Sequence, residues 1–277
     1  MERNGIKITG ASVSGVGTCL VVEPYKVVLD IGYCSPEART CRTVLITHPH
    51  IDHMAGAVQH AAGRSLSSNE PSRFICPPGV AAQLDQMLKL WVAIQGDFKY
   101  EIIPLVPGQS FNLGKNLSVK AVPTFHRTES QGYVLFETRG KLKPEYEGLE
   151  GAAIGALRKQ GVEVQDKVST PVLAYTGDTM PEALEDPDIR QARAVITECS
   201  FVGDPVTVEG ARKYGHTHLK ELAPRLESLT CDLLVLAHFS LRHSKADIVS
   251  AMASLPEAIR CKLELLLDGD EAIQGWS

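Results

Sequence analysis

A cluster of histidines and an aspartate fills one short stretch of the chain. The stretch T-H-P-H-I-D-H-M-A-G, residues 47–56, contains His48, His50, Asp52 and His53. Imidazole nitrogens and carboxylate oxygens are ligands that suit zinc, manganese or iron, and not the softer copper(I). A polar turn with solvated side chains is the ordinary explanation for a single histidine. Four such groups so close together instead predict a metal site.

Three further residues of the same types end apolar runs elsewhere. His126 closes S-V-K-A-V-P-T-F-H, Asp178 closes V-L-A-Y-T-G-D, and His238 closes D-L-L-V-L-A-H. Each alone could simply cap a turn, but strand ends project loops onto one rim of a sheet. All seven together exceed what one tetrahedral zinc can use. They suit two adjacent ions that share a carboxylate and a bridging water, and such a pair of ions is typical of hydrolysis.

The composition is that of an ordinary globular protein. The 277 residues are 44% hydrophobic and 22% charged, which is enough to bury a sizeable core. No Pro/Gly/Ser-rich linker or charge block divides the chain, so we expect a single domain over residues 1–277. The net charge of −5 argues against a broad basic binding surface but leaves room for a local basic groove.

Cysteine usage and hydropathy indicate the compartment. The seven cysteines are scattered and include no C-x-x-C pair, so we expect reduced thiols and a cytoplasmic location, with an organelle or the nucleus left open. The first residues lack the apolar core of a signal peptide, and no apolar run approaches the ~20 residues that cross a bilayer. We therefore expect no membrane association.

The elements that must position these residues are short strands and a few helices. Apolar alternation punctuated by glycine and proline predicts strands, and apolar residues three and four apart predict helices. The expected strands lie near residues 6–10, 18–23, 26–32, 43–48, 100–105, 117–126, 132–138, 171–179, 194–200 and 232–238. The expected helices lie near residues 54–62, 79–91, 219–229 and from 245 onward. This mixture predicts two sheets with helices outside, and residues 139–168 read as a short protruding insertion.

The histidine stretch carries a family resemblance. H-P-H-I-D-H resembles the H-x-H-x-D-H signature of the metallo-β-lactamase superfamily, which implies an αββα sandwich of two mixed β-sheets flanked by helices. Later segments resemble ribonuclease Z, the tRNA 3′-processing endonuclease, in its short plant-type form. These segments are P-T-F-H-R-T-E-S-Q-G-Y-V, K-L-K-P-E-Y-E-G-L, Y-T-G-D-T, T-E-C-S-F, Y-G-H-T-H and H-F-S-L-R. The resemblance spans most of the chain.

The resemblance implies a role for each candidate ligand. One metal would be held by His48, His50 and His126, and the other by Asp52, His53 and His238. Asp178 would bridge the two ions. Asp52 would also receive or orient the proton of the attacking water. Two Zn²⁺ ions are the default, although Mn²⁺ or Fe could occupy a site made of histidine and aspartate.

Glu198 in T-E-C-S and His216 in Y-G-H-T-H match a Glu-His pair of the family. A histidine held by a carboxylate is a competent general acid near neutral pH, so His216 would protonate the leaving oxygen. His218 lies two residues away and could be mistaken for this group. The helix that follows, L-K-E-L-A, favours His216.

Other residues receive lesser roles. Arg242 in H-F-S-L-R would contact a substrate phosphate, whereas His243 stands where the family has tyrosine. Asp30 resembles the superfamily's buried aspartate beneath the metal loop. It would hydrogen-bond to a metal-ligating histidine without binding the metal itself, although it could instead cap its own turn. We expect His60 and His243 to be structural or surface residues.

The ribonuclease Z reading implies a homodimeric zinc endoribonuclease. It would cut precursor tRNA after the discriminator base, leaving a 3′-hydroxyl on the tRNA and a 5′-phosphate on the trailer. Residues 141–168 lack the glycine/proline-rich tip of the tRNA-gripping arm found in many relatives. Their mixed charges fit a solvated surface at least as well as an RNA contact.

Two alternatives stay open at this point. A phosphodiesterase for small or cyclic phosphodiesters needs the same metals and no RNA-binding surface. A non-catalytic RNA-binding protein on the same fold would normally have lost ligands. The Glu198/His216 pair and H-F-S-L-R favour phosphodiesters over lactones or β-lactams.

Overall fold

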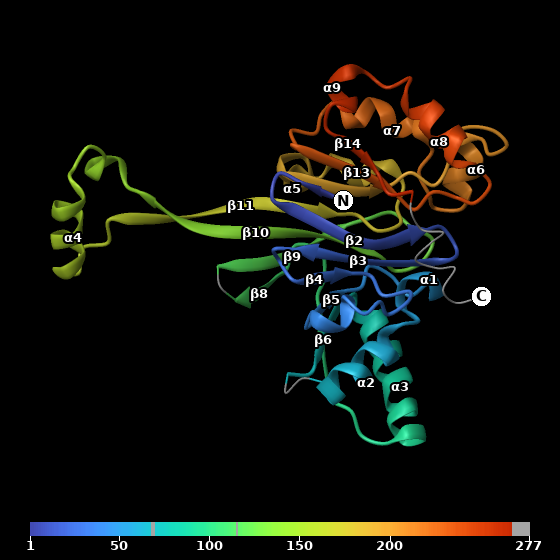
Figure 1. Ribbon diagram of the computed structural model, residues 1–277, viewed down its shortest axis with the longest axis horizontal. Helices are drawn as coiled ribbons and strands as arrows, with labels where there is room; N and C mark the ends of the chain where they lie inside the picture. Colours follow the sequence, from blue (N-terminus) through green and yellow to red (C-terminus); the bar gives the residue numbers. More distant parts are fainter. Residues whose placement is uncertain (68–69, 115, 268–277) are drawn as a thin grey trace.

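The computed structural model describes residues 1–67, 70–114 and 116–267. In these residues two seven-stranded β-sheets pack face to face, and helices cover the outer side of each sheet (Figure 1). This arrangement confirms the predicted αββα sandwich of two mixed sheets. The last part of the expected domain, residues 268–277, lies outside the described residues.

The first sheet contains the strands of the N-terminal half in chain order. They are β1 (Glu2–Arg3), β2 (Ile6–Val13), β3 (Gly17–Glu23), β4 (Val27–Leu29), β5 (Thr43–Leu45), β6 (Ser72–Cys76) and β7 (Tyr100–Pro104). The pairs from β1 to β4 are antiparallel and those from β4 to β7 are parallel.

The second sheet repeats this plan with the later strands. They are β8 (Ser110–Gly114), β9 (Leu117–Pro123), β10 (Gln131–Leu142), β11 (Gln165–Tyr175), β12 (Ala194–Glu198), β13 (Leu233–Ala237) and β14 (Leu263–Leu265). The pairs from β8 to β11 are antiparallel and those from β11 to β14 are parallel. The two halves therefore share one strand plan, although the sequence has no visible repeat.

Three apolar layers hold the sandwich together. Between the sheets, Leu20 and Leu45 of the first pack in one cluster with Tyr133 and Val235 of the second. Two further large clusters lie between each sheet and its helices. Burial of these side chains is the main favourable contribution to folding and fixes the two sheets against each other.

The helices divide between the two outer faces. Those beside the first sheet are η1 (Ala38–Thr40), α1 (Ile51–Met54), α2 (Ala57–Ser67) and α3 (Pro78–Gln95). Those beside the second sheet are η3 (Pro181–Glu185), α5 (Pro187–Gln191), α6 (Val208–Lys213), α7 (Leu219–Leu226), α8 (Lys245–Met252) and α9 (Glu257–Arg260). Within the described ranges, no helix has both the length and the apolar character that crossing a bilayer requires.

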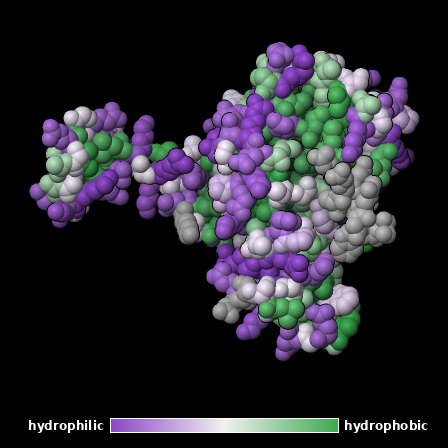
Figure 2. Space-filling view, viewed as in Figure 1, coloured by the Kyte–Doolittle hydropathy of each residue, from purple (hydrophilic) through white to green (hydrophobic). Residues whose placement is uncertain are grey.

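The β10–β11 hairpin projects far beyond the rest of the second sheet. Residues 139–168 form its outer end and include η2 (Pro144–Tyr146) and helix α4 (Gly151–Lys159), which the sequence pattern did not predict (Figure 1). Figure 2 shows hydrophilic surface along this arm with an apolar patch at its tip. We call residues 139–168 the arm.

Candidate metal and catalytic site

The candidate residues follow strands that end at one edge of the sandwich. Asp30 follows β4, and His48 and His50 follow β5, which is parallel to β4. Asp178 follows β11, and His238 follows β13 two strands further along the parallel part of the second sheet. Strands that run in the same direction carry their following loops to the same edge. Two antiparallel pairings give β9 the direction of β11, so the loop with His126 also lies there.

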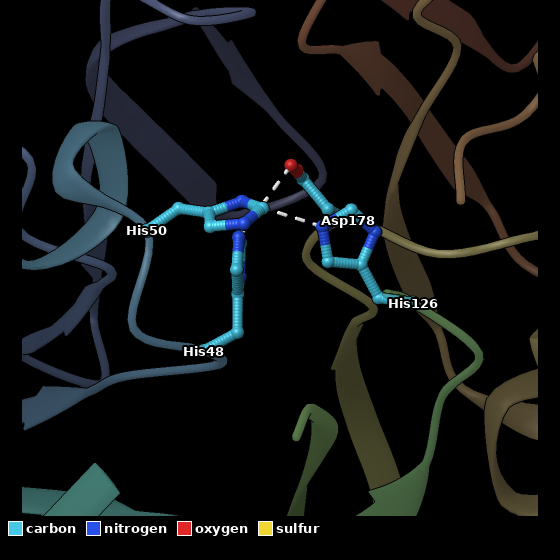
Figure 3. Close-up of side chains that lie close together, drawn as sticks. All are labelled: His48, His50, His126 and Asp178. Atoms are coloured by element: carbon cyan, nitrogen blue, oxygen red, sulfur yellow. Dashed lines mark hydrogen bonds and ion pairs between the residues drawn. The ribbon is translucent and has the colours of Figure 1, made fainter. Parts of the chain in front are cut away.

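The seven predicted ligands come together in two groups. Within each group the ligand atoms lie within 4.8 Å of one another: His48, His50, His126 and Asp178 in one, and Asp52, His53 and His238 in the other. Figure 3 shows the first group, whose side chains point toward one another from three separate loops.

Asp178 belongs to the first group and also faces the second. Its Oδ2 atom is 3.6 Å from Nε2 of His48, and its Oδ1 atom is 3.3 Å from Nε2 of His53. One carboxylate oxygen therefore faces each group. This is the arrangement that a carboxylate shared by two ions requires.

The buried polar atoms of this cluster fit a divalent metal. Nε2 of His48 and Oδ1 of Asp178 are buried and have no hydrogen-bond partner in the described part of the chain. Nε2 of His53 lies 3.2 Å from Nε2 of His238, so two nitrogens of the same kind face each other. Burying such atoms without partners costs free energy, and a coordinated cation would satisfy all of them.

Acceptors behind the cluster fix the tautomers of three histidines. Nδ1 of His53 donates to Asp30 at 2.8 Å, and Nδ1 of His126 donates to the Gly215 carbonyl at 2.7 Å. Nδ1 of His48 lies 2.9 Å from Oγ1 of Thr47, whose own hydroxyl donates to Asp30. A proton on Nδ1 leaves the lone pair of each Nε2 pointing into the cluster, which is what metal ligation needs.

Burial favours neutral imidazoles at two of these positions. Desolvation, followed by the charge of His53, lowers the pKa of His48 well below its usual range. Desolvation also lowers the pKa of His126, although the charge of Asp178 opposes it. Neutral imidazole is the form that binds metals, so both side chains suit this purpose at neutral pH.

Asp30 lies behind His53 and away from solvent. It accepts hydrogen bonds from Tyr175 Oη at 2.6 Å and from the Thr47 backbone N–H at 2.7 Å, in addition to the His53 bond. Its φ of +53° belongs to the left-handed region, which only a few non-glycine residues adopt. Donors from β11, from the loop after β5 and from α1 therefore converge on one carboxylate.

Two loops at this edge have unusual backbone conformations. Gly177, just before Asp178, has a φ of +60°, and a Cβ atom there would meet the Thr47 side chain at 2.6 Å. His238 has a φ of +60° without being glycine. Such conformations cost about 1–3 kcal/mol for a non-glycine residue, and they cluster at functional sites.

His216 lies beside the metal-type cluster and against a carboxylate. Its Nδ1 atom is 3.0 Å from Oε1 of Glu198 and 3.9 Å from Oδ2 of Asp178. Burial alone would lower the pKa of His216, but the charge and hydrogen bond of Glu198 outweigh burial and raise it to about 9. The Glu198 carboxylate therefore favours the protonated form of His216.

Glu198 itself is buried and held by several donors. Its oxygens accept bonds from the backbone N–H groups of Thr179 at 2.7 Å and Thr217 at 3.1 Å, and from Oγ of Ser200 at 2.6 Å. His218, by contrast, caps α7 by accepting a bond from the Lys220 N–H at 3.1 Å. Of the two histidines, the structure brings only His216 to the cluster.

The similarity of this chain to known proteins identifies its family. Residues 34–239 match the family described as "Beta-lactamase superfamily domain". tRNase Z TRZ1 of Arabidopsis thaliana is 34% identical over 273 residues, which cover 97% of this chain and 98% of that protein. The chain belongs to the tRNase Z family.

A second relative agrees with the tRNase Z family, and a solved structure agrees with the fold. The chloroplastic tRNase Z TRZ2 of Arabidopsis thaliana is 33% identical, and the match covers 97% of this chain and 77% of that protein. The crystal structure of human tRNase Z, short form, matches with a TM-score of 0.59 at 19% identity. That match covers 86% of this chain and 93% of the human one, and it supports the fold alone.

The remaining predicted residues of this tRNase Z family member lie outside the two ligand groups. Arg242 is exposed, while His243 is buried and accepts a bond from the Val202 N–H at 3.4 Å. His60 is buried in α2 and lies away from the candidate ligands, against Ser72 and the Ala38 carbonyl. Their environments give His60 and His243 structural contacts.

Sequence reasoning missed one residue at the centre of the site. Oγ of Ser200 donates to Glu198 and lies 3.3 Å from Nδ1 of His216 and 3.2 Å from Nδ1 of His238. This hydroxyl thus connects the Glu198/His216 pair with a candidate ligand. Ser200 lies inside the quoted T-E-C-S-F segment, but nothing in its residue type indicated this position.

Proposed function

We propose that this chain is a metal-dependent endoribonuclease that cuts precursor tRNA after the discriminator base. The observation that carries the proposal is near-full-length similarity to proteins named tRNase Z. The geometry supports it, because His216, which lies against the Glu198 carboxylate, is next to a cluster suited to divalent ions. Small and cyclic phosphodiesters and non-catalytic RNA binding are the less favoured alternatives.

The proposed cofactor is a pair of Zn²⁺ ions. His48, His50 and His126 would hold one ion, Asp52, His53 and His238 the other, and Asp178 both. When bound, such a pair supplies Lewis-acid activation of water and of the phosphate oxygens. Manganese or iron also suits this set of nitrogen and oxygen donors.

Asp52 orients the proton of the attacking water in this proposal. The backbone N–H of Gly15 donates to Oδ2 of Asp52 at 2.8 Å, which holds the carboxylate in place. The same oxygen lies 3.7 Å from Nε2 of both His53 and His238, in the middle of the second ligand group. A fixed acceptor here can take hydrogen bonds from water without moving.

His216 donates the proton that the leaving group needs. Attack at phosphorus breaks the bond to O3′, so the tRNA leaves with a 3′-hydroxyl and the trailer keeps a 5′-phosphate. The proton on His216 passes to O3′, and Glu198 stabilises and orients the imidazole through Nδ1. The exposed side chain of Arg242 would contact a substrate phosphate.

We also propose a homodimer, formed through the outer face of α1, α2 and α3. Large apolar side chains are exposed there, which is the usual mark of an interface. They are Ile51, Leu66, Leu90, Trp91 and Ile94.

A single domain over residues 1–277 and a cytoplasmic location stay predictions, and one relative is named as chloroplastic.

The decisive experiment assays purified, metal-loaded protein on 3′-extended precursor tRNA beside a chromogenic small phosphodiester. We expect cleavage after the discriminator base. Activity on the small diester alone would favour the phosphodiesterase instead. Asp52→Ala should abolish cleavage while most RNA affinity persists, and RNA binding without any cleavage by the unmodified protein would favour a non-catalytic role.

A further inference from the structure

Two exposed aromatic side chains flank the candidate site. Phe125 immediately precedes His126 and is 42% exposed, while Tyr214 lies two residues before His216 and is 40% exposed. The rings of His126 and His216 are themselves 5.1 Å apart. The two loops that carry catalytic-type histidines thus each present an aromatic residue to solvent.

A cation accompanies one of these rings. The guanidinium carbon of Arg127 lies 5.8 Å from the ring centroid of Tyr214, within the range of a cation–π contact. Arg127 directly follows His126 and is exposed. An aromatic face beside a planar cation is the surface on which nucleobases stack in proteins that bind single-stranded RNA.

The two loops are packed tightly enough to hold this surface in place. Besides the His126–Gly215 hydrogen bond, Gly215 has a φ of +73°, and a Cβ atom there would lie 2.9 Å from Nδ1 of His126 and 3.0 Å from Cγ of Arg127. Only glycine allows this close approach without displacing its neighbours. Gly215 therefore places Tyr214 and Arg127 side by side.

Both flanks of the surface are anchored through polar contacts. The backbone N–H of Phe125 donates to Oγ1 of Thr179 at 2.9 Å, so its backbone is fixed while its ring remains exposed. Helix α6 leads into Tyr214, and Nε of Arg212 in that helix donates to Glu221 of α7 at 2.8 Å. A rigid aromatic residue loses little conformational entropy when it binds, which favours its use as a contact residue.

We propose that Tyr214 on one loop, together with Arg127 and Phe125 on the other, forms a nucleobase-stacking subsite for a nucleotide next to the scissile phosphodiester. The inference rests on the proposed function and deepens it, because it assigns recognition of the cleavage position to the rim of the site. The base stacks on the ring of Tyr214, and the guanidinium lies where it neutralises the adjoining phosphate. Single exposed aromatic residues are common and need no function, but here they border both catalytic-type histidines.

The first test is a cycle of enzyme and substrate changes. We compare kcat/KM of the unmodified protein, Tyr214→Ala and Tyr214→Phe on 3′-extended precursor tRNA with a normal or an abasic nucleotide on either side of the scissile bond. Stacking contributes enough that Tyr214→Ala should lower kcat/KM by about 10- to 100-fold on the normal substrate. Tyr214→Phe keeps the ring and should stay within about threefold, because its stacking face is unchanged.

The abasic substrate separates stacking from structural damage. With the base removed at the stacked position, the unmodified protein should show the same loss, and Tyr214→Ala should lose nothing further. The alternative outcome is that the losses from Tyr214→Ala and from base removal multiply for the nucleotides on both sides of the scissile bond. In that case Tyr214→Ala acts by displacing His216, and the proposed subsite is wrong. The metal content of all variants is measured by mass spectrometry. Equal content shows that loss of metal does not cause the differences in kcat/KM.

A second test reads stacking without cleavage. In the Asp52→Ala background, 2-aminopurine placed next to the scissile bond of the same RNA should lose fluorescence on binding, and adding Tyr214→Ala should restore it. Quenching together with no cleavage by the unmodified protein would overturn the proposed function and keep the subsite. Cleavage without quenching would keep the proposed function and overturn the subsite. If neither quenching nor cleavage occurred, both proposals would be overturned.

Discussion

Oδ2 of Asp30 lies 2.8 Å from Nδ1 of His53, and both side chains are fully buried. The pair links both sheets to the proposed metal site, because Asp30 follows β4 of the first sheet and Tyr175 of the second sheet donates to the same carboxylate. The charge of Asp30 therefore serves both the fold and the orientation of His53.

Replacing Asp30 by Asn should weaken metal binding and the fold together. The change removes a buried charge that holds the His53 tautomer, so we expect a roughly 10- to 100-fold loss of zinc affinity. The free energy of unfolding should fall by about 3 kcal/mol, as for other broken buried pairs. Chelator competition and urea unfolding measure the two effects. Tyr175→Phe is the matched control, which removes one hydrogen bond and should cost only about 1 kcal/mol.

His216→Ala should lower kcat by about 10²- to 10⁴-fold, since general acid catalysis contributes on that scale. A 3′-bridging phosphorothiolate substrate checks the assignment, because its sulfur leaving group departs without protonation. The loss should shrink markedly on that substrate. An equal loss on both substrates would assign His216 a different role, and His218→Ala serves as the comparison because that side chain caps α7.

His60 should make the fold less stable in mild acid. Burial lowers the pKa of His60 to about 4 in the folded state, against an ordinary value near 6.5. Between these two pH values the unfolded chain binds a proton that the folded chain excludes, so stability is complete above about pH 6.5 and falls as the pH drops toward about 4. The loss at the acid end is roughly 3 kcal/mol.

Urea unfolding of the metal-free protein at pH 7.5 and pH 5 tests this expectation. His60→Gln should show a smaller loss of unfolding free energy between the two pH values than the unmodified protein. An identical pH dependence would mean that other groups cause the acid sensitivity. Chelator in both samples removes the separate effect of pH on metal binding.

The proposed dimer predicts a change of mass in solution. Ile94→Glu places a charge on the exposed apolar face of α3, where Ile94 is 63% exposed. Light scattering coupled to gel filtration should then find monomers where the unmodified protein forms dimers. Val249→Glu alters an equally apolar residue on α8, on the other side of the sandwich, and should leave the dimer intact.

The ligand-type residues could be predicted because strand ends are visible in the sequence. His126, Asp178 and His238 each follow an apolar run, and parallel strands bring such positions to one edge. Ser200 could not be found this way. Its hydroxyl gains meaning only from Glu198 and two histidines that tertiary packing brings around it.

The fold class was predictable, but the arm was less so. Strands were expected near residues 132–138 and 171–179, whereas β10 continues to Leu142 and β11 begins already at Gln165. In this two-stranded ribbon the side chains of both faces meet solvent, so the alternation of apolar and polar residues that reveals a strand is missing. The two sheets have the same order of antiparallel and parallel strands. This likeness leaves no repeat in the sequence, because the two halves share strand directions and not residue types.

The length of β11 sets the distance between the tip of the arm and the candidate site. Its 11 residues form one continuous strand from the arm to Tyr175, three positions before Asp178. At about 3.3 Å per residue, the tip stands roughly 35 Å or more from the hydrolytic centre. A mononucleotide cannot touch both places at once. Only a polymeric substrate is long enough to contact the tip of the arm and the hydrolytic centre together.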